Sequence, residues 1–283
     1  MIEYIKNIFS DDSEKVEDKP VKKSENFGSA DKIFEYFTTF TGMHFRKKEK
    51  ITRDKIINYC RRNNIYNFEE LYTTITTSKE SMQGLVDYLT VNETFFYREM
   101  DQINLLCDLA KKQTSKISIL CAPCATGEEV YSIVIALIES GVSSNRIEIT
   151  GIDINSSAIA DAKEGIYSER ALSKLDESII TQYFTKTDDN KYKIGNTIKN
   201  LTNFLQINIF DETFKNFGKF DYIFSRNMFI YFDKDDRKKA VNIFSKLLKD
   251  DDAYMFFGHA DTVDETEYLT KRYIGKTKIY YKP

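Results

Sequence analysis

The chain has 283 residues, of which 41% are hydrophobic and 30% are charged, and its formal net charge is −3. This length and hydrophobic share suffice for one large domain or two smaller ones with a complete core. The nearly balanced charge gives no overall field that would favour nucleic acid or a membrane surface, and no apolar run approaches the length that spans a bilayer.

Residues 1–26 are predicted to be a solvated, mobile tail. Residues 1–10 are interrupted by Glu3, Lys6 and Asn7 and lack a cleavage-site pattern, so we expect no secretory signal. Residues 11–26 are rich in Asp, Ser, Glu and Lys and nearly free of apolar side chains. The four cysteines are expected to be free thiols, which indicates a cytoplasmic protein.

Residues 27–98 are predicted to form several amphipathic helices. Apolar residues recur at helical spacing in 33–40, 68–75 and 82–89, and Gly42 is expected to end the first helix. The last stripe runs into a polar and aromatic stretch with Asn92, Thr94 and Arg98. That stretch is either a capping turn before core aromatics or a set of polar groups for a ligand, in which Arg98 would suit a carboxylate.

Residues 41–62 carry eight basic and two acidic side chains, a local charge of +6. On a helix most of the basic residues fall on one side, opposite Ile56, Ile57, Tyr59 and Cys60. A solvated helix face explains such a run, but the single sign favours docking to an acidic partner. The aromatics lie on the apolar side, which argues against nucleic acid. The predicted docking residues are Lys47, Lys48, Lys50, Lys55, Arg61 and Arg62.

Residues 117–138 predict a buried strand, a tight loop and a helix. Ile117, Ile119 and Leu120 form a short apolar run, and residues 122–127 are small residues plus a proline. Apolar residues then recur at the spacing of one helical stripe from 130 to 138, with Thr126 as the expected cap.

A second strand, 147–153, ends at Asp153, where an acid of a nucleotide-binding fold accepts hydrogen bonds from ribose hydroxyls. The preceding loop lacks the glycine pattern that cradles a pyrophosphate and carries Glu128 and Glu129 instead. This pattern argues against a dinucleotide or triphosphate and fits a positively charged nucleoside such as S-adenosylmethionine. A purely structural turn has the same composition.

Cys121 and Cys124 form a Cys-x-x-Cys pair in this loop. Zinc would need further Cys or His at ligand spacing, which neither His44 nor His259 supplies, so no metal site is expected. We interpret the pair as small residues that pack a tight loop.

The remaining chain alternates strands and helices, which predicts a parallel α/β sheet. We expect 191–194 and 197–209 to pair as an antiparallel hairpin, and Asp233 to cap a long helix. The expected helices are 158–163, 172–184 and 234–249, and the expected strands are 220–224, 253–258 and 274–281.

Several motifs together resemble the chemotaxis receptor glutamate O-methyltransferases. They are Asn92-Glu-Thr-Phe-Phe-Tyr-Arg98, Ala125-Thr-Gly-Glu-Glu-Val-Tyr-Ser132, Gly151-Ile-Asp153 with Gly165-Ile-Tyr167, residues 220–233, and Phe257-Gly-His-Ala260. The resemblance implies a helical domain over 27–98 and a Rossmann-like α/β methyltransferase domain over 99–283. It also implies a small antiparallel β-subdomain inserted near 185–203.

The resemblance also implies the reaction and its residues. S-adenosylmethionine would methylate glutamates in the cytoplasmic region of methyl-accepting chemoreceptors, leaving S-adenosylhomocysteine. Arg98 and Tyr231 would orient the substrate carboxylate. The implied cofactor contacts are Asn92, Thr94, Arg98, Glu128, Asp153, Asn208, Ile209, Arg226 and Asn227.

Two departures and two alternatives qualify this resemblance. Val130 replaces the usual proline, and residues 185–190 are short and free of glycine, so we expect no binding of a receptor C-terminal pentapeptide. We expect a monomer without membrane insertion. The alternatives are a methyltransferase of the same fold with another protein or a small molecule as substrate, and a signalling adaptor that binds the cofactor without turnover.

Overall fold

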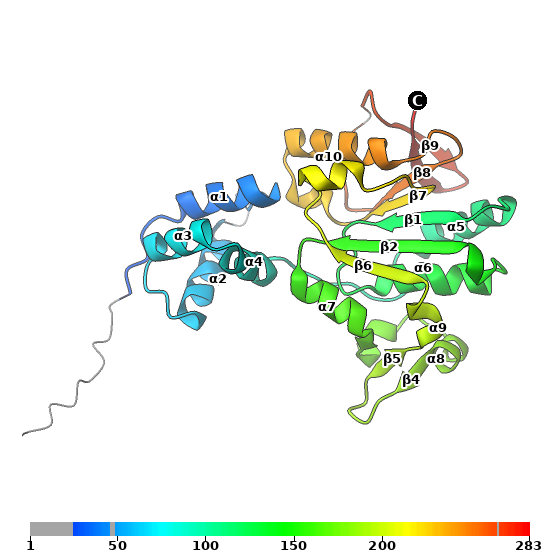
Figure 1. The fold of residues 1–283 in the computed structure, drawn as a ribbon, viewed down its shortest axis with the longest axis horizontal. Coiled ribbons are helices and arrows are strands. Elements are labelled where there is room, and N and C mark those ends of the chain that lie inside the picture. The colour runs from blue at the N-terminus through cyan, green and yellow to red at the C-terminus, as the bar shows by residue number, and fades with distance from the viewer. Residues whose placement is uncertain (1–24, 46–48, 265) are drawn as a thin grey trace, which may run out of the picture.

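The computed structural model describes residues 25–45, 49–264 and 266–283, and most of the predicted tail therefore lies outside the described residues (Figure 1). A group of four helices lies beside a larger α/β unit, to the left of its sheet in Figure 1. No helix in the described part of the chain is long and apolar enough to cross a membrane.

The four helices pack around a shared apolar core, and we call them the helical unit. They are α1 (Asp31–Thr41), α2 (Glu49–Arg62), α3 (Phe68–Thr77) and α4 (Lys79–Leu89). The three predicted apolar stripes supply this core, which includes Ile33, Leu71 and Leu85. Gly42 ends α1 in the left-handed conformation with a φ of 71°, as predicted.

The central sheet has seven strands in the order β6-β2-β1-β7-β8-β10-β9. They are β1 (Ile117–Cys121), β2 (Ile147–Asp153), β6 (Thr202–Gln206), β7 (Tyr222–Ser225), β8 (Tyr254–Phe257), β9 (Thr270–Ile274) and β10 (Thr277–Tyr281). The first five in this order are parallel, and β10 and β9 form an antiparallel hairpin at one edge. The α/β class predicted from the alternating pattern is confirmed.

Helices cover both faces of this sheet. Alternate residues of β1 enter two cores, with Ile117 and Ile119 in one and Leu120 in the other. The covering helices are α5 (Met100–Lys112), α6 (Glu128–Glu139), α7 (Ser156–Glu164) and α10 (Lys234–Leu247). The predicted cap of α10 is confirmed, because the Asp233 side chain accepts a hydrogen bond from the Asp236 amide.

The prediction that α6 carries a single apolar stripe is wrong. Every residue from Glu128 to Leu137 is buried, because α6 packs against β2 on one side and against α5 and α9 on others. A helix enclosed in this way needs apolar residues around its whole circumference.

The small antiparallel sheet consists of β3 (Ile166–Tyr167), β5 (Tyr192–Ile194) and β4 (Phe184–Lys186), in that order. The predicted pairing of 191–194 with 197–209 is wrong. Residues Asn196–Lys199 form the short helix α9, and β6 joins the central sheet beside β2. Residues 185–190 belong to the β4–β5 hairpin itself. The short helices are α8 (Glu177–Tyr183), η2 (Ser144–Arg146), η3 (Glu169–Leu172), η4 (Glu212–Asn216) and η5 (Phe229–Tyr231).

Candidate functional site

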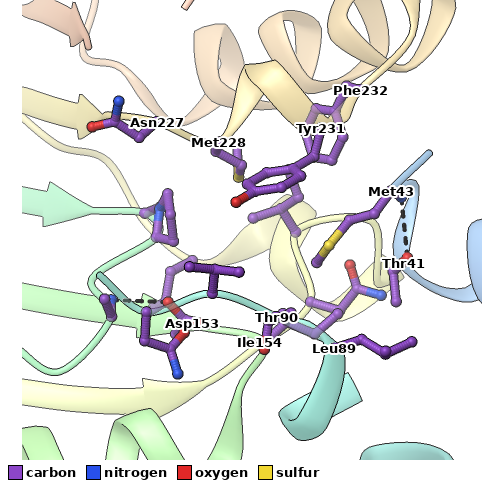
Figure 2. A pocket seen from close by; sticks show the side chains of 18 of the residues that line it. Thr41, Met43, Leu89, Thr90, Asp153, Ile154, Asn227, Met228, Tyr231 and Phe232 are labelled. Carbon is purple, nitrogen blue, oxygen red and sulfur yellow. Dashed lines mark hydrogen bonds between the residues drawn. The ribbon is translucent and has the colours of Figure 1, made fainter. Parts of the chain in front are cut away.

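A pocket lies between the helical unit and the carboxyl ends of the parallel strands (Figure 2). In an open parallel sheet this edge is the usual place for ligands. Figure 2 shows Tyr231 and Phe232 on one side of the pocket and Asp153 and Thr90 on the other. The lining residues from the α/β unit are Ala122, Pro123, Ala125, Ile152, Asp153, Ile154, Ile207, Asn208, Ile209, Asn227, Met228, Tyr231 and Phe232.

The loop after β1 forms one wall of the pocket. Its Ala125 has a φ of 46°, and its amide donates to Asp153 Oδ2 at 2.9 Å. The predicted cap at Thr126 is wrong: the N-cap of α6 is Gly127, with a φ of 92°, while the Thr126 hydroxyl donates to Glu128. These contacts hold the loop close to the end of β2.

Gly151 in β2 is required by this packing. A Cβ at position 151 would lie 2.9 Å from side-chain atoms of Cys124, Val130 and Phe204. Burial raises the pKa of the Cys124 and Cys121 thiols well above their ordinary value. Both cysteines are therefore neutral packing residues between the loop and the strands.

Asp153 places a buried carboxylate at the pocket. The side chain accepts hydrogen bonds from the amides of Ala125 and Asn155, both at 2.9 Å. Burial raises the pKa of Asp153, while hydrogen bonds from the amides of Asn155, Ala125 and Ile154 act in the opposite direction. Such a carboxylate can accept hydrogen bonds from two neighbouring hydroxyls of a ribose.

Asn208 connects the pocket to the helical unit. Its Nδ2 donates to the carbonyl of Phe40 at 2.6 Å, and its Oδ1 accepts from the amide of Phe210 at 3.0 Å. The side chain is thereby fixed, and Ile209 beside it adds an apolar surface to the lining. An apolar wall next to a polar strand end suits the flat face of a purine.

Asn227 and Tyr231 form the opposite wall. Asn227 has a φ of 62°, and its amide donates to Asp261 Oδ2 at 2.5 Å. Tyr231 lines the pocket, and burial raises the pKa of its hydroxyl, which therefore stays protonated and able to donate. Figure 2 shows the Tyr231 hydroxyl directed towards the space between these walls.

Asp261 provides a pH test of this wall. Burial raises its pKa from the ordinary 3.8 to about 6. The folded state therefore holds the proton more tightly than the unfolded chain. The tighter binding of this proton stabilises the folded state. This contribution is complete below pH 3.8 and is lost as the pH rises through 6.

We expect Asp261→Asn to gain stability relative to the native chain between pH 4 and 6.5, by about 3 kcal/mol, and to show no further relative change above that range. Urea unfolding at several pH values measures this difference. The exposed Asp264→Asn variant is the control. If the difference in stability between Asp261→Asn and the native chain did not change across this pH range, burial would not raise the pKa of Asp261.

Besides Arg226, three predicted contacts lie outside the lining of this pocket: Thr94, Arg98 and Glu128. The Arg98 guanidinium lies 3.4 Å from the Glu93 carbonyl and over the Phe95 ring. Glu128 lines a separate hollow with Asp161, Glu164 and Lys191, and burial raises its pKa. The pocket therefore gathers Asn92, Asp153, Asn208, Ile209, Asn227 and Tyr231 from the predicted set.

Arg226 also lies outside the pocket lining, and the structure gives it a supporting position. Its guanidinium pairs with Glu129 and donates to the carbonyl of Arg98 at 2.8 Å. Glu99 lies 3.8 Å away. All of these groups are buried or half-buried, so Arg226 ties the stretch before α5 to the start of α6 and the end of β7.

The helical unit contributes pocket residues that the sequence did not indicate. They are Thr41, Met43, Phe45, Leu89 and Thr90. His44 fixes this edge of the unit, because its amide donates to the Tyr231 carbonyl at 2.8 Å. Its Nε2 lies 2.9 Å from Asp236 and 3.3 Å from Asp233. Only the tertiary structure brings these residues together, so no local pattern could have identified them.

The predicted basic face lies on α2. Lys50, Arg61 and Arg62 are exposed, Lys55 is half-buried, and Lys47 and Lys48 lie outside the described residues. Ile56, Tyr59 and Cys60 are buried on the opposite side, as predicted. Arg61 pairs with Glu25 at 2.8 Å, and Arg62 lies over the Tyr88 ring.

Known proteins resemble this chain over most of its length. A family model described as "CheR methyltransferase, SAM binding domain" matches residues 92–279. A chemotaxis protein methyltransferase of Campylobacter jejuni is 34% identical over 242 residues, covering 86% of this chain and 91% of the relative. Chemotaxis protein methyltransferase 2 of Vibrio cholerae is 31% identical over 263 residues, with 88% and 91% covered. The corresponding protein of Escherichia coli is 27% identical, with 78% and 79% covered.

Proposed function

The chain belongs to the CheR methyltransferase family, and from that premise we propose that it methylates glutamate side chains of chemoreceptors. It is an S-adenosylmethionine-dependent methyltransferase. The proposed products are glutamyl methyl esters and S-adenosylhomocysteine, formed during chemotaxis adaptation. The proposed partner is the cytoplasmic region of a methyl-accepting receptor.

The observation that supports this proposal most directly is the pocket at the end of β2. Asp153 offers a carboxylate for ribose, and the loop after β1 is built from small residues that let a ligand approach the backbone. The loop has no glycine pattern for a pyrophosphate. These residues fit a nucleoside without phosphates, and S-adenosylmethionine supplies an electrophilic methyl group when bound.

We propose that the residues gathered by the pocket divide into two groups. Asn92, Asp153, Asn208, Ile209 and Asn227 contact the cofactor, and Tyr231 faces the substrate. Thr94, Arg98 and Glu128 are proposed as contacts from their places in the family motifs. Arg226 acts indirectly, because it holds the backbone beside Arg98 in place.

The chemistry needs orientation rather than a strong base. A glutamate side chain is ionised at neutral pH and is already nucleophilic, so no proton has to be removed from it. The protein must hold the carboxylate oxygen about 3 Å from the methyl carbon and in line with the bond that breaks. The Tyr231 hydroxyl can donate to the carboxylate without neutralising it, and the apolar wall of the pocket excludes water.

The exposed basic residues of α2 support the docking proposal. The double variant Lys50→Glu with Arg62→Glu reverses two charges on this face. We expect at least a fivefold lower rate of receptor methylation at low salt, because opposite charges speed association, with an unchanged Kd for S-adenosylhomocysteine. Initial rates of labelled methyl transfer to receptor-containing membranes measure the effect.

The matched control is Lys112→Glu with Lys116→Glu, which makes the same change in net charge outside α2. Equal loss in both variants would argue against docking through α2. Transfer to another protein or a small molecule, with none to receptors, would instead support a different substrate. Cofactor binding without any transfer would indicate a signalling adaptor.

A further inference from the structure

Helix α4 of the helical unit is hydrogen-bonded to the loop that follows Asp153. Asp87 accepts from the Ser156 amide at 2.8 Å and from the Ser156 hydroxyl at 2.5 Å. Gln83 donates to the Ile154 carbonyl at 2.8 Å. Asn155 donates to the Asp87 carbonyl at 3.1 Å. Helix α4 is therefore hydrogen-bonded to each of the residues 154–156.

Asn155 links these contacts to Asp153, which lines the pocket. Its amide donates to Asp153 Oδ1 at 2.9 Å, and its side-chain oxygen caps α7 by accepting from the Ala158 amide at 2.7 Å. Its Nδ2 also donates to the Thr90 hydroxyl at 2.7 Å. Only 1% of Asn155 is exposed, so water cannot replace these partners without opening the loop.

The charge of Asp87 suits this place. The first amides of α7 carry the positive end of the helix dipole, and the Ser156 amide is one of the groups that the helix itself leaves without a partner. Asn155 caps one such amide from within the loop, and Asp87 supplies a side-chain carboxyl oxygen as the acceptor for another from the helical unit. The position of this loop relative to Asp153 is therefore fixed in part by a residue outside the α/β unit, Asp87.

We propose that Asp87 is a positioning residue: it holds residues 154–156, which join β2 to the start of α7, so that the Asp153 carboxylate faces the pocket in its binding orientation. The helical unit then determines cofactor affinity through α4, in addition to the pocket residues that it contributes. This inference rests on the proposed function, because it takes Asp153 as a cofactor contact.

The test compares the Kd of S-adenosylhomocysteine by titration calorimetry in the full chain. We expect Asp87→Ala to raise the Kd about tenfold, the size expected for loss of charge-assisted hydrogen bonds. Asp87→Asn keeps an acceptor for the Ser156 amide and should recover most of the affinity. In steady-state assays, Asp87→Ala should raise the KM for S-adenosylmethionine while kcat changes by less than threefold.

Two controls separate positioning from general stability. Ile75→Val weakens the core of the same unit from α3, and an isoleucine side chain makes no hydrogen bond to the loop, so it should lower the Tm and leave the Kd within twofold of native. Ser156→Ala removes only one partner of Asp87 and should raise the Kd by less than Asp87→Ala does.

A Kd for Asp87→Ala within twofold of native would overturn the inference, as would an equal increase in Ile75→Val. Absence of binding by the native chain would overturn the proposed function together with it.

Discussion

Replacing Asp153 by alanine is expected to raise the Kd for S-adenosylhomocysteine by about 100-fold or more, because both roles of the carboxylate are lost together. The proposed hydrogen bonds to the ribose disappear, and the amides of Ala125 and Asn155 lose their acceptor. The loop after β1 and the loop after β2 then no longer share a fixed anchor. Titration calorimetry with the native chain and the variant measures this loss.

Two further variants sharpen the result. Asp153→Asn retains one oxygen acceptor and should bind with an affinity between those of the native chain and Asp153→Ala. Asp161→Ala removes an exposed carboxylate from the neighbouring α7 and should leave the Kd within about twofold of native. Binding by Asp153→Ala at nearly native affinity would place the ribose elsewhere in the protein.

The second large effect is expected for Arg226→Met, which should lower the free energy of unfolding by about 3–5 kcal/mol. The side chains of Arg226 and Glu129 are 4% and 9% exposed, so the variant leaves a carboxylate buried without its partner. The carbonyl of Arg98 also loses a donor. Urea unfolding monitored by circular dichroism gives the difference directly.

The control for this prediction is Arg170→Met, whose exposed ion pair with Glu93 should contribute less than about 1 kcal/mol. Adding Glu129→Leu to Arg226→Met should recover part of the lost stability, because the uncompensated charge is removed. If Arg226→Met instead kept native stability and lost only cofactor binding, the side chain would be a direct ligand contact rather than a support.

The pattern of apolar and polar residues is sufficient to predict those elements of the fold that depend on neighbouring residues in the sequence. The strand, loop and helix around residue 127 follow from an apolar run, small residues and a helical repeat, and α10 begins directly after its predicted cap, Asp233. The partner of 197–209 could not be predicted in this way. An alternating strand fits the edge of either sheet, and only the helical turn at Asn196–Lys199 separates it from β5.

The site was predictable where a motif residue ends a strand. Asp153 ends β2 and Asn227 follows β7, and the carboxyl ends of parallel strands meet at one edge of a sheet. Met43 and Thr90 gave no such signal, since they reach the pocket only when the helical unit packs on the α/β unit. The sequence could not reveal that the Arg226 guanidinium would pair with Glu129.

The central claim is methyl transfer to receptor glutamates, and the chemical nature of the product tests it most directly. Chemoreceptor-containing membranes are incubated with the native chain and methyl-labelled S-adenosylmethionine, and the labelled receptor is then treated with alkali. We predict that the label leaves as methanol, as a glutamyl methyl ester requires, and that Asp153→Ala yields almost none. Label that resists alkali, or a receptor that stays unlabelled while the native chain binds S-adenosylhomocysteine, would contradict the claim.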